Sequence, residues 1–260
     1  MISIIIPCYN YYDYVGACLQ SCEAQDYRGE YEIVVVDDCS TDDSREVLNW
    51  YHYHGNKEYR IIWHSENKGY SAAKNSGIRL AKGDYIVHLD ADDMLTPWSL
   101  SVRAKVLDEN QDIDVVHGCA KILRDDNCDN CMDGALFQID TLRTHPSYIH
   151  AQGVMLRRRV FEKYGLYYEP LRRGKGDKEY WQRIGIYKSC NKPYKNWQKD
   201  PAKDKKIKDI VAFYRIHGKG MKAQRRGDAK RGRDIQDIFD RRIRQIRREG
   251  ITKENTAFLV

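Results

Sequence analysis

The sequence predicts an α/β fold in which a mixed, mainly parallel sheet is flanked by helices. Over roughly the first hundred residues, short apolar runs alternate with longer segments of helical periodicity, which is the pattern of consecutive βαβ units. The first run, residues 3–6, does not alternate with polar residues, and this favours a strand buried on both faces. Carboxylates gather directly after two later runs, where the strands of open α/β sheets bind ligands.

The expected strands are short and regularly spaced in the first half of the chain. They cover residues 3–6, 31–36, 59–64, 84–89 and 114–118, with a late strand at 210–216. The pattern weakens over residues 119–149, which read as irregular turns, and over the Lys-rich residues 191–208, which read as a loop. Residues in the 150s predict one further strand.

Helices are expected between these strands. They begin at Asp13 or Tyr14 and at Ser40 or Thr41, cover residues 71–81, follow Pro97, and return around residues 158–164 and over residues 177–187. Val15 and Leu19 lie on one face of the first helix. Ser40 or Thr41 can cap the second, Gly83 can end the third, and Pro97 suits the first turn of the fourth.

The C-terminal segment carries the excess positive charge of the chain. Residues 221–250 hold eleven Lys and Arg against five Asp and Glu, which accounts for the net charge of +6. Apolar residues recur in it at helical spacing: Ile235, Ile238, Phe239, Ile243 and Ile246. Two interpretations stay open, namely an amphipathic helix packed on the domain and a surface for an anionic partner such as an acidic membrane or nucleic acid.

Bulk composition is that of a soluble globular enzyme, with 42% hydrophobic and 32% charged residues. The longest apolar runs, residues 4–6 and 33–36, fall far short of the roughly 20 residues of a membrane helix. Met1 opens directly on a strand-like run without a basic leader, so a cytoplasmic protein is expected, with peripheral contact to a membrane as an option. The eight cysteines are expected to be reduced, and zinc or redox use of Cys128 and Cys131 is the lesser alternative.

Two groups of carboxylates follow predicted strands. Asp37 and Asp38 end the second, and the fourth runs into Asp90, Asp92 and Asp93. Neighbouring carboxylates repel, so a fold tolerates them best where a cation or hydrogen-bond donors offset the charge. Asp-x-Asp at a strand end can hold Mg²⁺ or Mn²⁺ and leave positions open for a diphosphate. Taken alone, the motif would favour a solvated acidic turn that caps the helix after Pro97.

Four blocks in the first hundred residues resemble family 2 glycosyltransferases of the GT-A fold. They are residues 3–10 (SIIIPCYN), 34–42 (VVVDDCSTD), 67–77 (NKGYSAAKNSG) and 83–93 (GDYIVHLDADD). The resemblance implies a GT-A domain over residues 1–220, with a nucleotide-sugar-binding half (1–118) and an acceptor half (119–220), followed by a basic helical extension (221–260).

The resemblance also implies a donor site. Its residues would be Pro7, Tyr9, Asp37, Asp38, Lys68, Asp90 and Asp92. An Asp of the 37–38 pair would accept the N–H of a uracil-like base, and Lys68 would donate to base or phosphate unless it is an exposed loop lysine. Asp92 would coordinate Mn²⁺ or Mg²⁺, and Asp90 would contact the ribose or the metal shell. The metal would stabilise the departing nucleoside diphosphate as a Lewis acid.

The acceptor half matches the family less closely. Residues 153–165 resemble the segment before the catalytic Glu-Asp pair of the family, and Trp181 and Arg183 place Asp177 at the position of the base. Gly176 replaces the acid expected before it, and Glu179 is the rival base or, with Trp181, an acceptor contact. An inverting transfer needs one carboxylate to take the proton of the acceptor hydroxyl.

Residues 213–221 (FYRIHGKGM) resemble a late Tyr-Arg-x-His block of the family. There the histidine completes the metal shell or contacts the diphosphate, so His217 is a candidate ligand, with a structural role as the alternative. His64 and the other histidines receive no role.

The expected activity is therefore transfer of a sugar, with inversion, from a nucleoside-diphosphate donor such as a UDP-sugar to a hydroxyl of a glycan, a lipid-linked molecule or another acceptor. A nucleotidyltransferase is one alternative, but it favours a Gly- and Lys-rich loop where residues 7–12 (PCYNYY) stand. A nucleic-acid- or membrane-docking protein with a vestigial donor site is the other. The sequence indicates neither the sugar, nor the acceptor, nor the oligomeric state.

Overall fold

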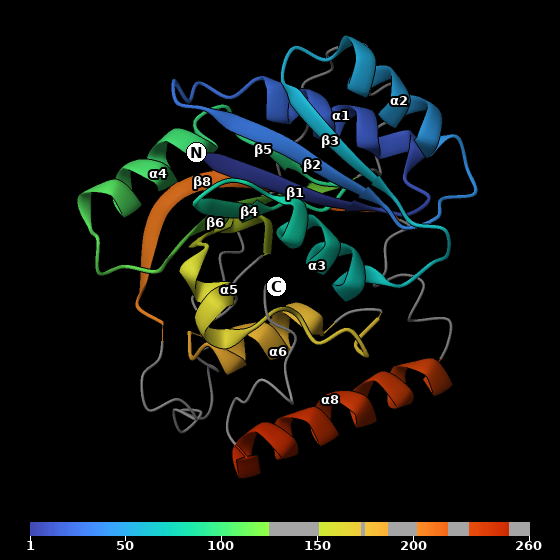
Figure 1. The fold of residues 1–260 in the computed structure, drawn as a ribbon, viewed down its shortest axis with the longest axis vertical. Coiled ribbons are helices and arrows are strands. Elements are labelled where there is room, and N and C mark those ends of the chain that lie inside the picture. Colours follow the sequence, from blue (N-terminus) through green and yellow to red (C-terminus); the bar gives the residue numbers. More distant parts are fainter. Residues whose placement is uncertain (125–150, 173–174, 187–201, 218–228, 250–260) are drawn as a thin grey trace.

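A single sheet organises the protein. The computed structural model describes residues 1–124, 151–172, 175–186, 202–217 and 229–249. Within them, eight strands form one sheet in the order β3-β2-β1-β4-β7-β6-β8-β5 (Figure 1). The expected mixed, mainly parallel α/β architecture is confirmed.

The first half of the chain builds the parallel part of the sheet. It consists of β1 (Ile2–Cys8), β2 (Tyr31–Asp37), β3 (Glu58–Trp63) and β4 (Tyr85–His88). β1 pairs with β2 and β4, and β2 pairs with β3, all in parallel. Every residue of β1 and β2 is buried, as expected for strands covered on both faces. Their carboxyl ends therefore meet at one edge of the sheet.

The second half extends the sheet from β4. Its strands are β7 (Val154–Arg157), β6 (Val115–Arg124), β8 (Asp204–Ile216) and the two-residue β5 (Met94–Leu95). β7 is antiparallel to β4 and β6, β8 runs parallel to β6, and β5 is antiparallel to β8. β6 and β8 are both longer than the sequence predicted, because each strand supplies hydrogen-bond partners for the other over most of its length.

Helices cover both faces (Figure 1). One face carries α1 (Tyr12–Glu23), α2 (Ser44–His54) and α4 (Ser99–Glu109). The other carries α3 (Tyr70–Leu80), α5 (Arg159–Tyr164) and α6 (Gly176–Arg183), with a short 3₁₀ turn, Ala151–Gly153, before β7. In β1, Ile4 and Ile6 point to the first layer and Ile5 to the second.

The start of α2 corrects one expectation. The helix begins at Ser44, and neither Ser40 nor Thr41 caps it. The backbone N–H of Ser40 instead donates to the carboxylate of Asp37, and its hydroxyl accepts from the backbone N–H of Asn10. These bonds keep Ser40 in the turn after β2, so the loop beside the sheet edge is longer than predicted.

The basic C-terminal segment forms α8 (Ala229–Glu249), which contacts α6. Phe239 and Ile243 pack with Leu171, and Ile238 lies against the same cluster. Ile238, Phe239 and Ile243 of the predicted apolar stripe therefore pack on the domain, while contact with an anionic partner stays a prediction. None of the described helices is both long enough and apolar enough to cross a bilayer.

Five cysteines lie in the described residues and are free thiols: Cys8, Cys18, Cys22, Cys39 and Cys119. Burial raises the pKa of Cys8 to about 12, which makes it an inert core residue. The other three cysteines, Cys128, Cys131 and Cys190, fall outside the described residues. The same holds for the zinc or redox use considered for Cys128 and Cys131.

Candidate active site

The turn after β4 concentrates negative charge. Asp90, Asp92 and Asp93 can bring one carboxylate oxygen each within 4.8 Å of one another. Burial raises the pKa of Asp90 to about 6; the Lys74 ammonium opposes this shift, and the charge of Asp92 adds to it. Burial, and then the charges of Asp92 and Asp90, raise the pKa of Asp93 well above its usual value. A turn of this kind gains most from a cation placed between its carboxylates.

β8 delivers a histidine to this turn. The backbone N–H of Arg215 donates to Asp93 Oδ1 at 2.7 Å, and Arg215 Nε donates to the carbonyl of Asp92 at 3.0 Å. His217 stands two residues after Arg215, just past the end of β8, and its Nε2 lies 2.9 Å from Asp92 Oδ2. Its ring lies 4.3 Å from that of Tyr14. The short β5, which the sequence did not predict, holds β8 beside the residues that follow the turn.

Asp92 and His217 fit a divalent cation. Neighbouring ligands of an octahedral ion with bonds of about 2.1 Å lie about 3 Å apart, and the two atoms are 2.9 Å apart. A carboxylate with a neutral imidazole is a donor set that Mn²⁺ accepts. His217 Nδ1 is buried without a hydrogen-bond partner among the described residues, so Nε2 is the nitrogen that faces the carboxylates.

Asp177 reaches the same site from α6. Lys74 Nζ on α3 donates to Asp177 Oδ1 at 2.7 Å. The hydroxyl of Tyr70 donates to Asp90 Oδ1 at 2.6 Å and lies 3.4 Å from Asp177 Oδ2. The side chain of Asp177 is 29% exposed, so a ligand can reach it. The structure thus brings together Asp90 and Asp177, whose positions differ by 87 in the sequence.

The carboxylates after β2 form a separate network. Asp38 accepts from the backbone N–H groups of Lys68 and Gly69, at 2.8 and 2.7 Å, and lies 2.7 Å from His64 Nδ1. Asp37 is fully buried and accepts from Arg45 Nε at 2.7 Å. Asp38 Oδ2 has one of these donors and Oδ1 has two, which leaves an acceptor position on Oδ2 for a ligand.

The three other residues predicted for the donor site, Pro7, Tyr9 and Lys68, differ in how far they are exposed. Tyr9 is exposed at the end of β1, whereas Pro7 lies inside the strand opposite Val36 and is buried. The Lys68 side chain is exposed. Tyr9 and Lys68 are therefore open to a ligand at this edge of the sheet, whereas the buried Pro7 is not.

The structure does not bring Glu179 or Trp181 to this site, which corrects the expectation that they contact an acceptor. Glu179 is 0% exposed and pairs with Arg183 Nε at 2.9 Å and with Arg242 Nε at 3.5 Å. Trp181 is buried in the apolar layer beneath the sheet. Both side chains are packed in the protein interior, so neither faces a bound acceptor.

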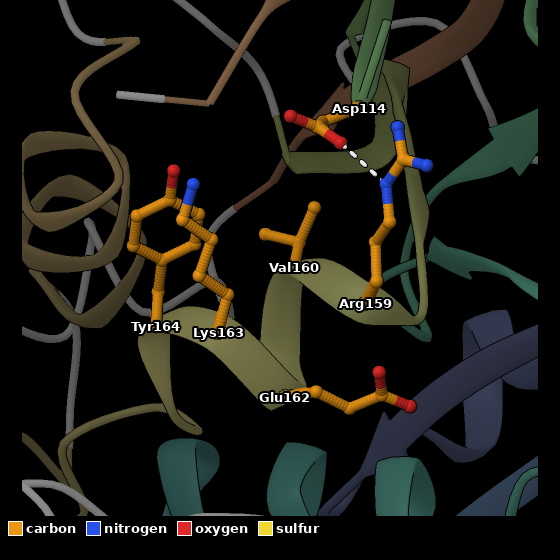
Figure 2. A pocket seen from close by; sticks show the side chains of 6 residues that line it. All are labelled: Asp114, Arg159, Val160, Glu162, Lys163 and Tyr164. Carbon is orange, nitrogen blue, oxygen red and sulfur yellow. Dashed lines mark hydrogen bonds and ion pairs between the residues drawn. The ribbon is translucent and has the colours of Figure 1, made fainter. Parts of the chain in front are cut away.

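A hollow of about 530 Å³ lies away from these residues (Figure 2). It is lined by Asp114, Arg159, Val160, Glu162, Lys163 and Tyr164. Asp114 and Arg159 point toward each other across it and form an ion pair at 2.7 Å. Asp114 precedes β6 at the amino edge of the sheet, opposite the edge where Asp90 follows β4. The hollow therefore offers no place for donor chemistry.

Four residues of this site were not predicted from the sequence: Tyr70, Lys74, His64 and Arg215. Each acts through a partner far along the chain, so no local motif marks it. One signal was present for Lys74: Ser71 and Gly77, three positions before and after it on the helix, are small, so this face can pack closely against another segment. A lysine on such a face is buried, and a buried lysine needs an acidic partner.

The sequence model of glycosyl transferase family 2 matches residues 3–165. The chain belongs to this family. Glycosyltransferase GlyG of Streptococcus pneumoniae is 39% identical over 119 residues, which are 45% of this chain and 38% of GlyG. Poly(ribitol-phosphate) beta-glucosyltransferase of Bacillus spizizenii is 39% identical over 115 residues, 42% of this chain and 18% of that protein. The chain thus spans well under half of these curated relatives.

Solved structures share the fold. S. aureus TarS residues 1–349 in complex with UDP-GlcNAc superpose with a TM-score of 0.64 at 21% identity, covering 85% of this chain and 60% of that one. Mannosyltransferase PcManGT from Pyrobaculum calidifontis, in complex with GDP-Man and Mn²⁺, gives 0.62 at 19% identity, covering 86% and 59%. The expected GT-A fold and the resemblance to family 2 are confirmed.

Proposed function

We propose that the chain transfers a sugar with inversion from a UDP-sugar to a hydroxyl acceptor, assisted by Mn²⁺ or Mg²⁺. The observation that supports this most strongly is the position of Asp177 beside Asp90, with the Tyr70 hydroxyl between the two carboxylates. A single displacement needs the base next to the group that is transferred, and the proximity of Asp177 to Asp90 supports such a position.

On the donor side, Asp92 and His217 would hold the metal, and Asp90 would contact the ribose or complete the metal shell. A bound cation would stabilise the charge that develops on the leaving diphosphate. Asp38 would accept the base N–H through Oδ2, and Tyr9 and Lys68 would line the nucleotide. The presence of UDP-GlcNAc in the TarS complex favours UDP, and GDP-Man with Mn²⁺ in PcManGT keeps GDP as the alternative.

On the acceptor side, Asp177 would remove the proton of the attacking hydroxyl. The curated relative that glucosylates poly(ribitol-phosphate) makes a polyol or glycan hydroxyl a reasonable acceptor class. We place this activity in the cytoplasm, in a GT-A domain over residues 1–220. The basic extension, residues 221–260, would contact an anionic acceptor or membrane surface.

Calorimetric titration tests the donor side. UDP and GDP are titrated into the protein with and without Mn²⁺, and the titration is repeated on Asp92→Ala and on Asp84→Ala. Asp84 is 82% exposed and lies at the other edge of the sheet, so its substitution matches the change in charge without touching the site. We expect metal-dependent UDP binding that Asp92→Ala abolishes and Asp84→Ala preserves. Binding of GDP alone would change the donor, and binding of neither nucleotide would refute the proposal.

A further inference from the structure

One face of α3 is polar and buried. Tyr70, Ser71, Lys74 and Asn75 occupy positions i, i+1, i+4 and i+5 of the helix, and the last three are 0% exposed. Amphipathic helices normally place apolar residues on the covered face. A polar face in that position indicates that the helix binds the backbone and charges of another segment.

That segment is residues 167–172, which come shortly before α6 in the sequence. The Asn75 side chain donates to the carbonyl of Tyr167 and accepts from its N–H, both at 2.9 Å. Ser71 Oγ donates to the carbonyl of Leu171 at 3.0 Å. These bonds hold the backbone of the segment against α3 at Tyr167 and at Leu171.

The junction is close enough to require a glycine. Gly69 precedes α3 with φ of +94°, and a Cβ there would lie 2.6 Å from Arg172 Cβ. The backbone N–H of Tyr70 donates to the carbonyl of Arg172 at 2.8 Å, and Arg172 Nε donates to the carbonyl of Lys68 at 3.1 Å. The start of α3 and the segment before α6 therefore form one contact surface.

Lys74, on the same face of α3, contacts Asp177, the proposed base. Its ammonium is fully buried, 2.7 Å from Asp177 Oδ1, and lies 4.3 Å from the ring centroid of Tyr70 and 5.0 Å from that of Tyr167. A buried ammonium is costly without an anion, and the aromatic faces restrict where it can lie. Asp177 Oδ1 is therefore held in one place.

The Tyr70 hydroxyl separates the roles of the two oxygens of Asp177. A hydroxyl has one proton, and the bond of 2.6 Å to Asp90 Oδ1 takes it in preference to the contact of 3.4 Å with Asp177 Oδ2. Oδ1 is already occupied by Lys74. Oδ2 therefore keeps a lone pair that faces the donor carboxylates.

We propose that Lys74 and Tyr70 are positioning residues for the transfer: Lys74 anchors Oδ1 of Asp177 and Tyr70 fixes Asp90, so that Oδ2 of Asp177 takes the proton of the acceptor hydroxyl. This rests on the proposed function. In the step, the acceptor oxygen forms its bond to the anomeric carbon as its proton moves to Oδ2. The bond from that carbon to the phosphate oxygen breaks, and its electron pair leaves with the nucleoside diphosphate.

The test compares Lys74→Met, Lys74→Arg and Tyr70→Phe with two matched controls. Tyr85→Phe removes a tyrosine hydroxyl that donates to a carboxylate at the same 2.6 Å, and Lys82→Met removes a lysine paired with a carboxylate at 2.9 Å, both at the other edge of the sheet. Donor turnover, with water or an added sugar as acceptor, gives kcat and the donor KM. UDP affinity with Mn²⁺ is measured separately by calorimetry.

We expect Lys74→Met to lower kcat by about 100-fold, the loss that a base displaced by about 1 Å produces. Lys74→Arg should recover most of it, because a guanidinium can also hold Oδ1. Tyr70→Phe should lower kcat by about tenfold, the size expected for one lost hydrogen bond to a charged group. UDP affinity and both controls should stay within about twofold of wild type. Unchanged kcat in Lys74→Met, or loss of UDP binding equal to the loss of kcat, would overturn the inference.

A thermal measurement tests the Lys74–Asp177 pair without turnover. Asp177→Asn alone leaves a buried ammonium without its anion, so it should lower Tm more than the double variant with Lys74→Met does. Equal Tm values for the single and the double variant would refute the ion pair between Lys74 and Asp177, whatever the activities of the variants. If the wild-type protein bound no nucleoside diphosphate, the proposed function would be refuted instead. The comparison of Tm values would still test the ion pair between Lys74 and Asp177.

Discussion

Asp90 should be more useful to the reaction than to the fold, and replacing it by Asn should stabilise the protein at neutral pH. Burial raises the pKa of its carboxyl from 3.8 to about 6, so the native state binds a proton that the unfolded chain releases between these values. Stability is therefore lost as the pH rises through this window. At about 1.4 kcal/mol per unit of pKa, the upper limit of this loss in the free energy of unfolding is about 3 kcal/mol. Contact with solvent and coupling to Asp92 reduce the expected loss to about 1–2 kcal/mol. Asn carries no charge and avoids the loss.

The assay is the unfolding temperature of wild type, Asp90→Asn and the charge-matched Asp84→Asn, across pH and without divalent metal. At about 2–4 °C per kcal/mol, Asp90→Asn should gain about 2–8 °C above pH 7 and nothing near pH 4. Saturating Mn²⁺ should narrow the difference, because a cation stabilises the ionised wild-type carboxylates. A variant that is no more stable than wild type at neutral pH, or whose advantage does not change with pH, would refute the reasoning.

Three further substitutions probe the surroundings of the site. Glu179→Gln should destabilise the protein by about 3–5 kcal/mol in urea unfolding, because two buried arginines lose their carboxylate; the exposed pair lost in Glu58→Gln should cost less than about 1 kcal/mol. His64→Ala should weaken UDP binding about tenfold in calorimetry by freeing Asp38, with little change in kcat. Phe239→Ala should cost about 3 kcal/mol of stability by removing the apolar contact of α8, and UDP affinity should survive.

The donor half was predictable because its signals are local. Buried parallel strands are continuous apolar runs, and the carboxylates that follow them reach one edge of the sheet by topology alone. The order β7-β6-β8-β5 in the other part of the sheet was not predictable, because it depends on pairings between segments that are distant in the sequence. β5 has only two residues, too few for any periodicity, and it is what places β8 and His217 beside Asp92.

The links between donor and base were also invisible to local patterns. Lys74 and Tyr70 meet Asp177 across 103 and 107 residues of sequence, respectively. The motif that contains them resembles the family, so it predicted a donor-site helix, but a motif names no partner for its polar side chains. Their role follows only from the packing of the segment before α6 on the buried polar face of α3.

The proposal of Asp177 rather than Glu179 as base is supported by helix geometry. At about 100° per residue, side chains two positions apart point about 200° away from each other, so only one of the two can face the donor. Glu179 shares its face with Arg183 one turn on, and their ion pair is buried, which leaves Asp177 for the site. The same packing accounts for Gly176, where the family pattern has an acid. A Cβ at this position would lie 2.7 Å from Ser71 Oγ, which is held by the carbonyl of Leu171. The close approach of α3 therefore disfavours a second carboxylate at this position, and we propose that the acceptor is bound without it.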